Sequence, residues 1–257
     1  MKRNLIFFIV VIFLASTIYA QNNSKKDKII FAYGGGFNPT FINYVAKLTG
    51  KEKPKICFLP TASADSPYGI IRWYDACSEL NVIPSVVRVW ISSYYEKLSF
   101  EEQLLSVDAI VVGGGNTLNM MAIWKAQGID TVLAKAYDNG IVLAGGSAGS
   151  LCWFVEGTTD SRPKKLTTVK GLGFLNYSHS PHYSSEKFRR PLYQKMIANG
   201  EFISGYAIDN KAGVVFKNGK YFKAISLSEK DKAYFVRVQD NKVVEDELKI
   251  EIIKQSH

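Results

Sequence analysis

Short apolar runs alternate along the chain with segments in which apolar residues recur at helical spacing. The apolar runs occupy residues 28–33, 55–59, 86–91, 108–112 and 141–144. Their mainly apolar character is typical of strands covered on both faces of a sheet. Helical spacing predicts helices at residues 39–48, 68–80, 117–126 and 131–137, with a short helix after Ser99. The alternation predicts an α/β fold: a doubly wound, mostly parallel sheet flanked by helices.

The pattern changes in the C-terminal part of the chain. A helix is predicted at residues 185–199, and Gly200 follows it. Short strands are predicted after it, at residues 206–209, 212–216, 220–224, 233–238 and 248–253. Asn218 and Gly219 form a strong hairpin signal between two of these strands. We expect antiparallel strands added to the edge of the same sheet, and one α/β domain over residues 28–257.

The first twenty residues differ from the rest of the chain. Lys2 and Arg3 precede an apolar run at residues 5–15, and the segment ends at the small residue Ala20. This order predicts a signal peptide at residues 1–20, with cleavage after Ala20. The run is shorter than the roughly 20 residues of a membrane span, although an uncleaved anchor is the alternative. We expect export to the periplasm or beyond, without stable membrane association once the signal is removed.

Charge and cysteine content narrow the function classes. The formal net charge is +9, but the basic residues are scattered and no basic run with interleaved aromatic residues occurs. Nucleic-acid binding is therefore not expected. The three cysteines lack metal-ligand spacing and their odd number argues against a disulfide framework. We expect buried free thiols at Cys57, Cys77 and Cys152, and no metal or other cofactor.

Three glycine-rich turns follow predicted strands, at residues 34–36, 113–115 and 145–149. Ligands of doubly wound sheets gather at the carboxyl ends of the strands, where these turns lie. The first turn is not a dinucleotide fingerprint, because Pro39 stands where the last glycine of that motif is required. The third turn, Gly-Gly-Ser-Ala-Gly, places Ser147 between a strand and a helix. Such a turn presents a nucleophile beside free amides, although a serine that only caps the helix is the alternative.

A serine nucleophile needs a base and a group that orients the base. The chain has three histidines, of which His257 is the last residue. We predict His182 as the base and His179 as a neighbouring or surface residue. Asp160 is the first candidate for the orienting acid, with Glu156 as its rival and Asp209 as a third choice. Nucleophile, acid and base would fall within residues 147–182, a compact order that differs from that of α/β-hydrolase esterases.

The chain carries four motifs: Val-Val-Gly-Gly-Gly-Asn-Thr at 111–117, Ala-Gly-Gly-Ser-Ala-Gly-Ser at 144–150, Trp-Phe-Val-Glu-Gly-Thr-Thr-Asp-Ser at 153–161 and Ser-Pro-His-Tyr at 180–183. Together they resemble the aspartyl dipeptidase (peptidase E) and cyanophycinase family of serine peptidases. The resemblance covers about residues 29–216. It implies a fold similar to class I glutamine amidotransferases, with serine in place of their cysteine. It makes Ser147 the nucleophile and His182 the base. Asp160 matches the peptidase E aspartate after a small gap, and the cyanophycinase glutamate keeps Glu156 open.

The resemblance also implies an oxyanion hole. The backbone amides of Gly114 or Gly115 and of Ala148 would bind the charged oxygen of the tetrahedral intermediate. Asn116 would contact the main chain of the substrate, or would serve only as the N-cap of the following helix.

The implied activity is hydrolysis of small peptides, with dipeptides that carry an N-terminal aspartate as the first class. Arg189 and Arg190 are candidates for binding the substrate carboxylate, because a guanidinium offers a fork of donors; a solvated helix face is their alternative. A hydrolase of β-aspartyl isopeptides or esters, and a non-catalytic binding protein on the same fold, remain open. A homodimer also remains open.

Overall fold

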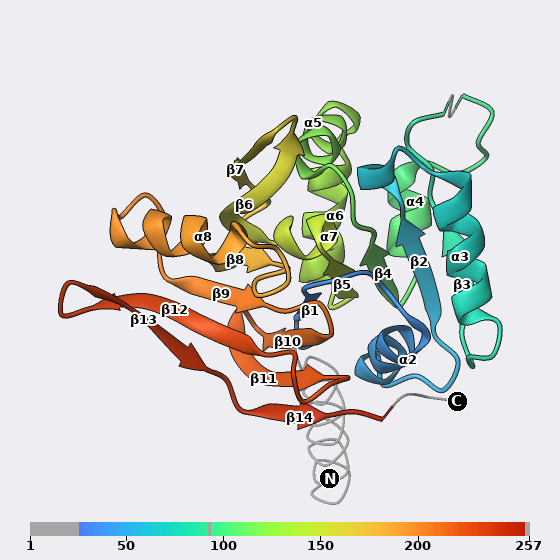
Figure 1. The fold of residues 1–257 in the computed structure, drawn as a ribbon. Coiled ribbons are helices and arrows are strands. Elements are labelled where there is room, and N and C mark those ends of the chain that lie inside the picture. The colour runs from blue at the N-terminus through green and yellow to red at the C-terminus, as the bar shows by residue number, and fades with distance from the viewer. Residues whose placement is uncertain (1–25, 92–93, 255–257) are drawn as a thin grey trace, which may run out of the picture.

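The computed structural model describes residues 26–91 and 94–254. These residues form two sheets joined side by side, with helices against both (Figure 1). The first sheet has eight strands and the second has six. The predicted signal peptide and His257 lie outside the described residues.

The first sheet is parallel at its centre. Its order is β14-β11-β10-β1-β5-β4-β2-β3. The five parallel strands are β1 (Ile29–Tyr33), β2 (Lys55–Leu59), β3 (Ile83–Val86), β4 (Ala109–Val112) and β5 (Val142–Gly146). Three later strands extend it. Strand β10 (Ala212–Lys217) is antiparallel to β1, and β11 (Lys220–Ser226) is antiparallel to β10. The last strand, β14 (Ile250–Ile252), is parallel to β11. The carboxyl ends of the parallel strands meet at one edge.

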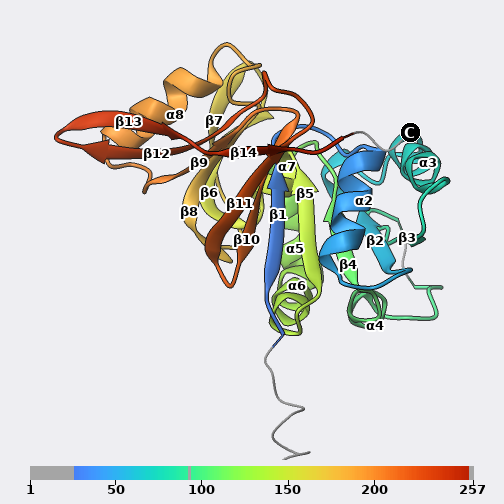
Figure 2. The same ribbon diagram turned by 90° about the horizontal axis from the view of Figure 1, so that it is seen from below.

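Helices cover both faces of this sheet (Figure 2). Alternate residues of β1 show why: Ile30 and Ala32 belong to one buried cluster, and Phe31 and Tyr33 to another. One face is covered by α2 (Pro39–Leu48) and α3 (Pro67–Cys77), and the other by α4 (Phe100–Leu105), α5 (Thr117–Gln127) and α6 (Ile129–Asp138). The doubly wound prediction is therefore confirmed. Within the described ranges, no helix is long and apolar enough to cross a bilayer.

The prediction for the C-terminal half is confirmed for β10 and β11, which extend the first sheet as antiparallel strands, and is corrected for the strands that form a second sheet. The order of this second sheet is β13-β12-β9-β8-β6-β7. Its strands are β6 (Phe154–Arg162), β7 (Lys165–Lys170), β8 (Leu175–Pro181), β9 (Gly205–Ile208), β12 (Ala233–Gln239) and β13 (Lys242–Glu247). The segment around Asp160 is part of β6. Because β6 and β8 supply a new sheet, β9 and β12 pair there instead of extending the first sheet. The helix α8 (Arg189–Ala198) packs on this second sheet.

Two local predictions have different outcomes. The hairpin between β10 and β11 is confirmed, since Asn218 and Gly219 have φ values of 52° and 78°. The third strand was expected at residues 86–91, but β3 covers Ile83–Val86. The backbone leaves the sheet after Val86 because the amides of Val89 and Trp90 bond the carboxylate of Asp65 instead.

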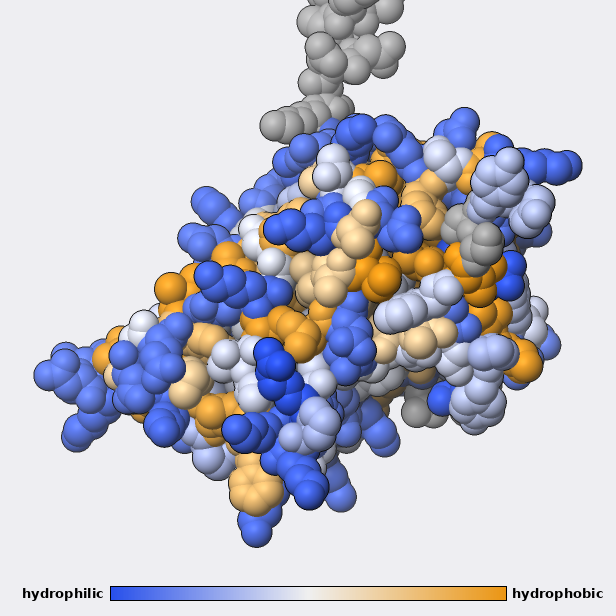
Figure 3. Space-filling view, turned by 90° about the horizontal axis from the view of Figure 1, so that it is seen from above, coloured by the Kyte–Doolittle hydropathy of each residue, from blue (hydrophilic) through white to orange (hydrophobic). Residues whose placement is uncertain are grey.

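Exposed apolar side chains are scattered over the surface. Figure 3 shows the molecule from above, where hydrophobic residues are interspersed with hydrophilic ones and are most frequent near the middle of the face. Tyr68, Ile71 and Tyr74 of α3 are among the large apolar side chains that remain exposed. Isolated exposed apolar residues are common on folded proteins and do not by themselves mark a site.

Candidate active site

Ser147 lies at the sharp turn between β5 and α7 (Ala148–Leu151). Its φ and ψ are 56° and −118°, a conformation that non-glycine residues rarely adopt and that clusters at functional sites. The flanking glycines allow the turn. A Cβ on Gly146 would lie 1.9 Å from the Gly35 carbonyl oxygen, and one on Gly149 would lie 2.1 Å from that of Val112. The Gly-Gly-Ser-Ala-Gly sequence therefore lets three backbone segments approach one another and presents the serine at the strand end.

Backbone amides surround the serine. Gly114 lies against it, because a Cβ on Gly114 would be 3.2 Å from the Cβ of Ser147. No hydrogen bond within the described part of the chain uses the amides of Gly114 and Gly115. The amide of Ala148 is the first of α7 and has no acceptor within that helix. The arrangement can accept a developing negative charge next to Ser147.

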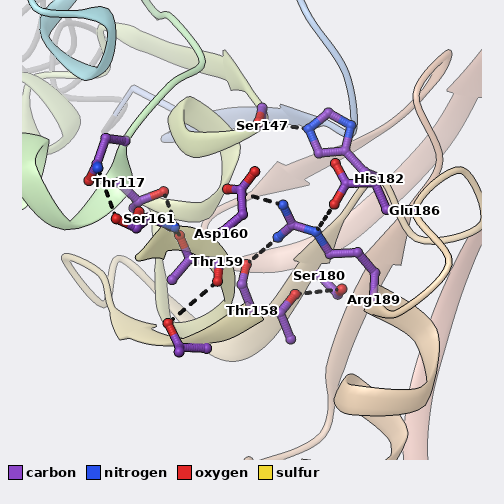
Figure 4. Close-up of polar contacts among 12 residues, drawn as sticks. Thr117, Ser147, Thr158, Thr159, Asp160, Ser161, Ser180, His182, Glu186 and Arg189 are labelled. Atoms are coloured by element: carbon purple, nitrogen blue, oxygen red, sulfur yellow. Dashed lines mark hydrogen bonds and ion pairs between the residues drawn. The ribbon is translucent and has the colours of Figure 1, made fainter. Parts of the chain in front are cut away.

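His182 directly follows β8 and has a φ of 55°. Its Nε2 lies 2.7 Å from the Oγ of Ser147 (Figure 4). Its Nδ1 lies 2.6 Å from the Oδ1 of Asn210, in the connection between β9 and β10. The predicted contact between serine and histidine is thus present. The two side chains come from different sheets, Ser147 from the first and His182 from the second.

The predicted orienting acids lie elsewhere. The carboxylate of Asp160 is 3.3 Å from Nη2 of Arg189. The carboxylate of Glu156 accepts a 3.1 Å hydrogen bond from the amide of Ile203. Neither carboxylate bonds His182, so both assignments to the orienting position are wrong for this structure. Asp160 pairs with Arg189 and not with His182 because β6 brings its carboxylate to the buried guanidinium. A guanidinium attracts a carboxylate more strongly than a neutral imidazole does.

Asp209 comes close to the predicted role but does not fill it. The residue is 4% exposed, and its carboxylate accepts hydrogen bonds from the amides of Ser184 at 2.8 Å and Lys232 at 2.9 Å. The next residue, Asn210, makes the contact with the histidine. Sequence reasoning missed it because a search for an acid excludes an amide; its place at the end of β9, beside Asp209, was the available signal.

Arg189 is buried at the centre of a polar cluster. Its side chain is 2% exposed. Its Nε is 2.6 Å from the Glu186 carboxylate, and its Nη1 donates to the Thr158 carbonyl at 2.7 Å. Figure 4 shows the guanidinium between the carboxylates of Asp160 and Glu186, beside Ser147 and His182. Its donors therefore already hold two carboxylates, which contradicts the prediction that Arg189 binds a carboxylate of the substrate.

Arg190 is committed to a different structural contact. It pairs with the carboxylate of Glu245 on β13 and lies over the rings of Tyr183 and Tyr234. Burial raises the pKa of Glu245, but hydrogen bonds from Arg190, Tyr183 and Gln194 outweigh it and the pKa is lowered. This pairing ties α8 to β12 and β13. In this structure Arg190 thus has a structural role, and its assignment to substrate binding stays a prediction.

Asn116 is the N-cap of α5. Its Oδ1 accepts a 2.9 Å hydrogen bond from the amide of Asn119, and its Nδ2 donates to the Ser161 carbonyl at 3.0 Å. It thereby joins the amide loop at residues 113–115 to β6. The capping alternative is confirmed, and a contact of Asn116 with substrate stays a prediction.

His179 is fully buried rather than at the surface. Its Nδ1 donates to the Tyr206 carbonyl at 2.8 Å, and its Nε2 lies 2.9 Å from the Oγ of Ser150. Burial, with smaller contributions from the charges of Arg189 and His182, lowers its pKa from 6.5 to about 3. The ring is therefore neutral at ordinary pH and supports the helix that follows the serine.

The cysteines offer neither disulfides nor a metal site. All three are buried free thiols, as predicted. Burial raises the pKa of Cys57 and of Cys77 to about 12, and raises that of Cys152 well above its usual value. In the described part of the chain, no group of three histidine, cysteine or acidic side chains is placed to hold a metal ion.

Comparison with known sequences identifies relatives over most of the chain. Residues 30–224 match the model of Peptidase family S51. The chain is 42% identical over 223 residues to the protein named uncharacterized peptidase YgaJ of Bacillus subtilis, a match that covers 85% of this chain and 95% of that protein. It is 24% identical over 144 residues to peptidase E of a Nostoc species, covering 55% of this chain and 57% of the relative.

Solved structures support the fold. A peptidase from an acI-B1 actinobacterium has a TM-score of 0.69 at 16% identity, covering 88% of this chain and 96% of that one. A putative peptidase E from Listeria monocytogenes has a TM-score of 0.58 at 20% identity, covering 79% and 100% respectively. With a family model that spans most of the chain and a relative of 42% identity, the chain belongs to peptidase family S51 and is a serine-type peptidase.

Proposed function

We propose that the chain is an exported peptidase that hydrolyses small peptides, with Ser147 as nucleophile and His182 as base. The observation that carries this proposal is the 2.7 Å contact between the Oγ of Ser147 and the Nε2 of His182, at a turn with rare backbone angles. Export rests on the basic and apolar order of the first twenty residues.

The reaction follows from the geometry. The Oγ of Ser147 attacks the peptide carbonyl carbon while Nε2 of His182 takes the hydroxyl proton. The resulting oxyanion is bound by the amides of Gly114 or Gly115 and Ala148. As the C–N bond breaks, Nε2 returns the proton to the leaving amine. Water then loses a proton to Nε2, attacks the acyl-enzyme and releases Ser147 with its proton restored.

The substrate class begins with dipeptides that carry an N-terminal aspartate, as the family resemblance suggests. One observation favours a requirement for a positive group on the substrate. The carboxylates of Asp160 and Glu186, 66% and 41% exposed, lie on Arg189 beside Ser147. A free α-ammonium group is the positive charge that every unblocked dipeptide offers.

A dipeptide panel tests the substrate. It contains Asp-X, isoAsp-X, neutral X-X and basic X-X peptides, each also in N-acetylated form, with an ester series beside it. Asp-X cleavage that is lost on acetylation supports the proposal. Preference for isoAsp-X or for esters replaces it with the isopeptide or ester alternative.

A fluorophosphonate probe tests the nucleophile without a known substrate. The wild-type protein should label at Ser147, and Ser147→Ala should neither label nor turn over peptides. A protein that does not label and cleaves nothing is the non-catalytic binding protein. A Ser147→Ala variant with full activity refutes the mechanism.

A further inference from the structure

The ring nitrogen of His182 that faces away from Ser147 meets an amide and not a carboxylate. Nδ1 lies 2.6 Å from the Oδ1 of Asn210. The side chains of Asp160, Glu156 and Asp209 bond other groups. We propose that Asn210 is the positioning residue of His182, so that an uncharged side chain holds the base. The inference rests on the proposed function of Ser147 and His182.

The contact selects one protonation pattern of the ring. Oδ1 of Asn210 can only accept a hydrogen bond, so Nδ1 of His182 carries the ring proton. Nε2 then has its lone pair towards the hydroxyl of Ser147, 2.7 Å away. This is the tautomer in which a neutral imidazole can take the hydroxyl proton. A side chain that donated to Nδ1 would leave the proton on Nε2 and remove the base.

The backbone fixes where Asn210 stands. Its carbonyl accepts a 3.1 Å hydrogen bond from the amide of Gly35, and a Cβ at Gly35 would come within 2.6 Å of that oxygen. The preceding residue, Asp209, binds the amide of Ser184, two positions after His182. The carboxylate of Asp209 therefore joins the two segments, while the amide of Asn210 makes the contact with the ring.

The charges near His182 are already committed. Glu186, whose amide bonds the carbonyl of His182, is paired with Arg189, as is Asp160. Asp209 faces backbone amides, and the nearby His179 is buried and neutral. The imidazolium formed in the reaction would thus be stabilised at Nδ1 by an amide dipole. Exchanging that amide for a carboxylate would favour the protonated ring, so the free base would appear only at higher pH.

The first experiment measures the rate at which a fluorophosphonate labels Ser147 from pH 4 to pH 9. Asn210→Asp should move the acid limb of the profile up by about one pH unit. Asn210→Leu should lower the plateau rate by about tenfold to a hundredfold, through misplacement of the base, without moving the acid limb. The matched control is Asn241→Asp, at the exposed turn between β12 and β13, which adds the same charge and should reproduce the wild-type profile.

The second experiment needs no activity. Nitrogen-15 NMR of the histidine side chains reports which ring nitrogen carries the proton, and His182→Gln assigns the signal. Wild type should show the Nδ1-protonated form at neutral pH, and Asn210→Leu should show a mixture. The proposal is overturned by an Asn210→Leu variant with wild-type labelling rate and tautomer, or by an Asn210→Asp variant with an unmoved acid limb. Absence of labelling in the wild-type protein would instead refute the proposed function, and the NMR result would still decide the role of Asn210.

Discussion

Lowering the pH from 7 to 5 should destabilise the fold through His179. The ring is fully buried and its pKa is lowered from 6.5 to about 3. Between pH 6.5 and pH 3 the ring binds a proton in the unfolded chain but not in the folded chain. The free energy of unfolding therefore has its full value above pH 6.5 and falls as the pH drops towards 3. At pH 5 the solution is about 1.5 pH units below the pKa of the unfolded chain, and each unit contributes about 1.36 kcal/mol. The free energy of unfolding is therefore lower by about 2 kcal/mol.

Urea unfolding followed by tryptophan fluorescence measures this loss, at pH 7 and pH 5 and constant ionic strength. The comparison is with His179→Gln, which keeps a donor for the Tyr206 carbonyl and a polar group for Ser150 but does not titrate. Ordinary carboxylates titrate near pH 4, mostly below this range. Wild type should lose about 2 kcal/mol more than the variant. Equal losses in the two proteins would show that His179 is not the titrating group and would refute the reasoning.

Three further predictions follow from particular contacts. Gly114→Ala should lower kcat/KM about tenfold to a hundredfold with little change in the thermal midpoint, because the added methyl crowds Ser147; an unchanged rate would contradict the placement of the amide loop. Glu245→Gln should lower the free energy of unfolding by roughly 1–2 kcal/mol, because Arg190 loses its anion and is itself partly screened by solvent, and equal stability in urea titrations would count against this. Ellman's reagent should leave the thiols of Cys57, Cys77 and Cys152 unmodified in the folded protein, because all three are buried, and should react with all three in urea.

The central parallel sheet and the serine turn could be predicted from sequence because their signals are local. Apolar runs of four or five residues, bounded by turn residues and separated by segments with helical spacing, favour buried strands. The glycines around Ser147 mark a close backbone approach, which the structure shows at Gly146 and Gly149. His182 could be predicted for another reason. The chain has only three histidines, and one of them follows a proline at the end of a strand.

The contacts that depend on the second sheet were not predictable in the same way. The segment at residues 154–162 contains threonine, serine and charged residues, so it reads as a loop until β8 pairs with it. That pairing is what buries Arg189 between two carboxylates. The contact between Asn210 and His182 likewise requires β9 to run beside β8, a pairing between segments more than twenty residues apart that no local pattern encodes.

The two partners of the 2.7 Å contact at the centre of this molecule are carried by separate β-structures. The distance between them therefore depends on how the two sheets pack against each other. Aromatic residues such as Phe154, Tyr206 and Phe216 lie between the two sheets. The rate of the reaction therefore depends on how the two sheets are placed relative to each other. Truncating one of these buried rings should therefore lower turnover as well as stability, because it lets one sheet shift against the other.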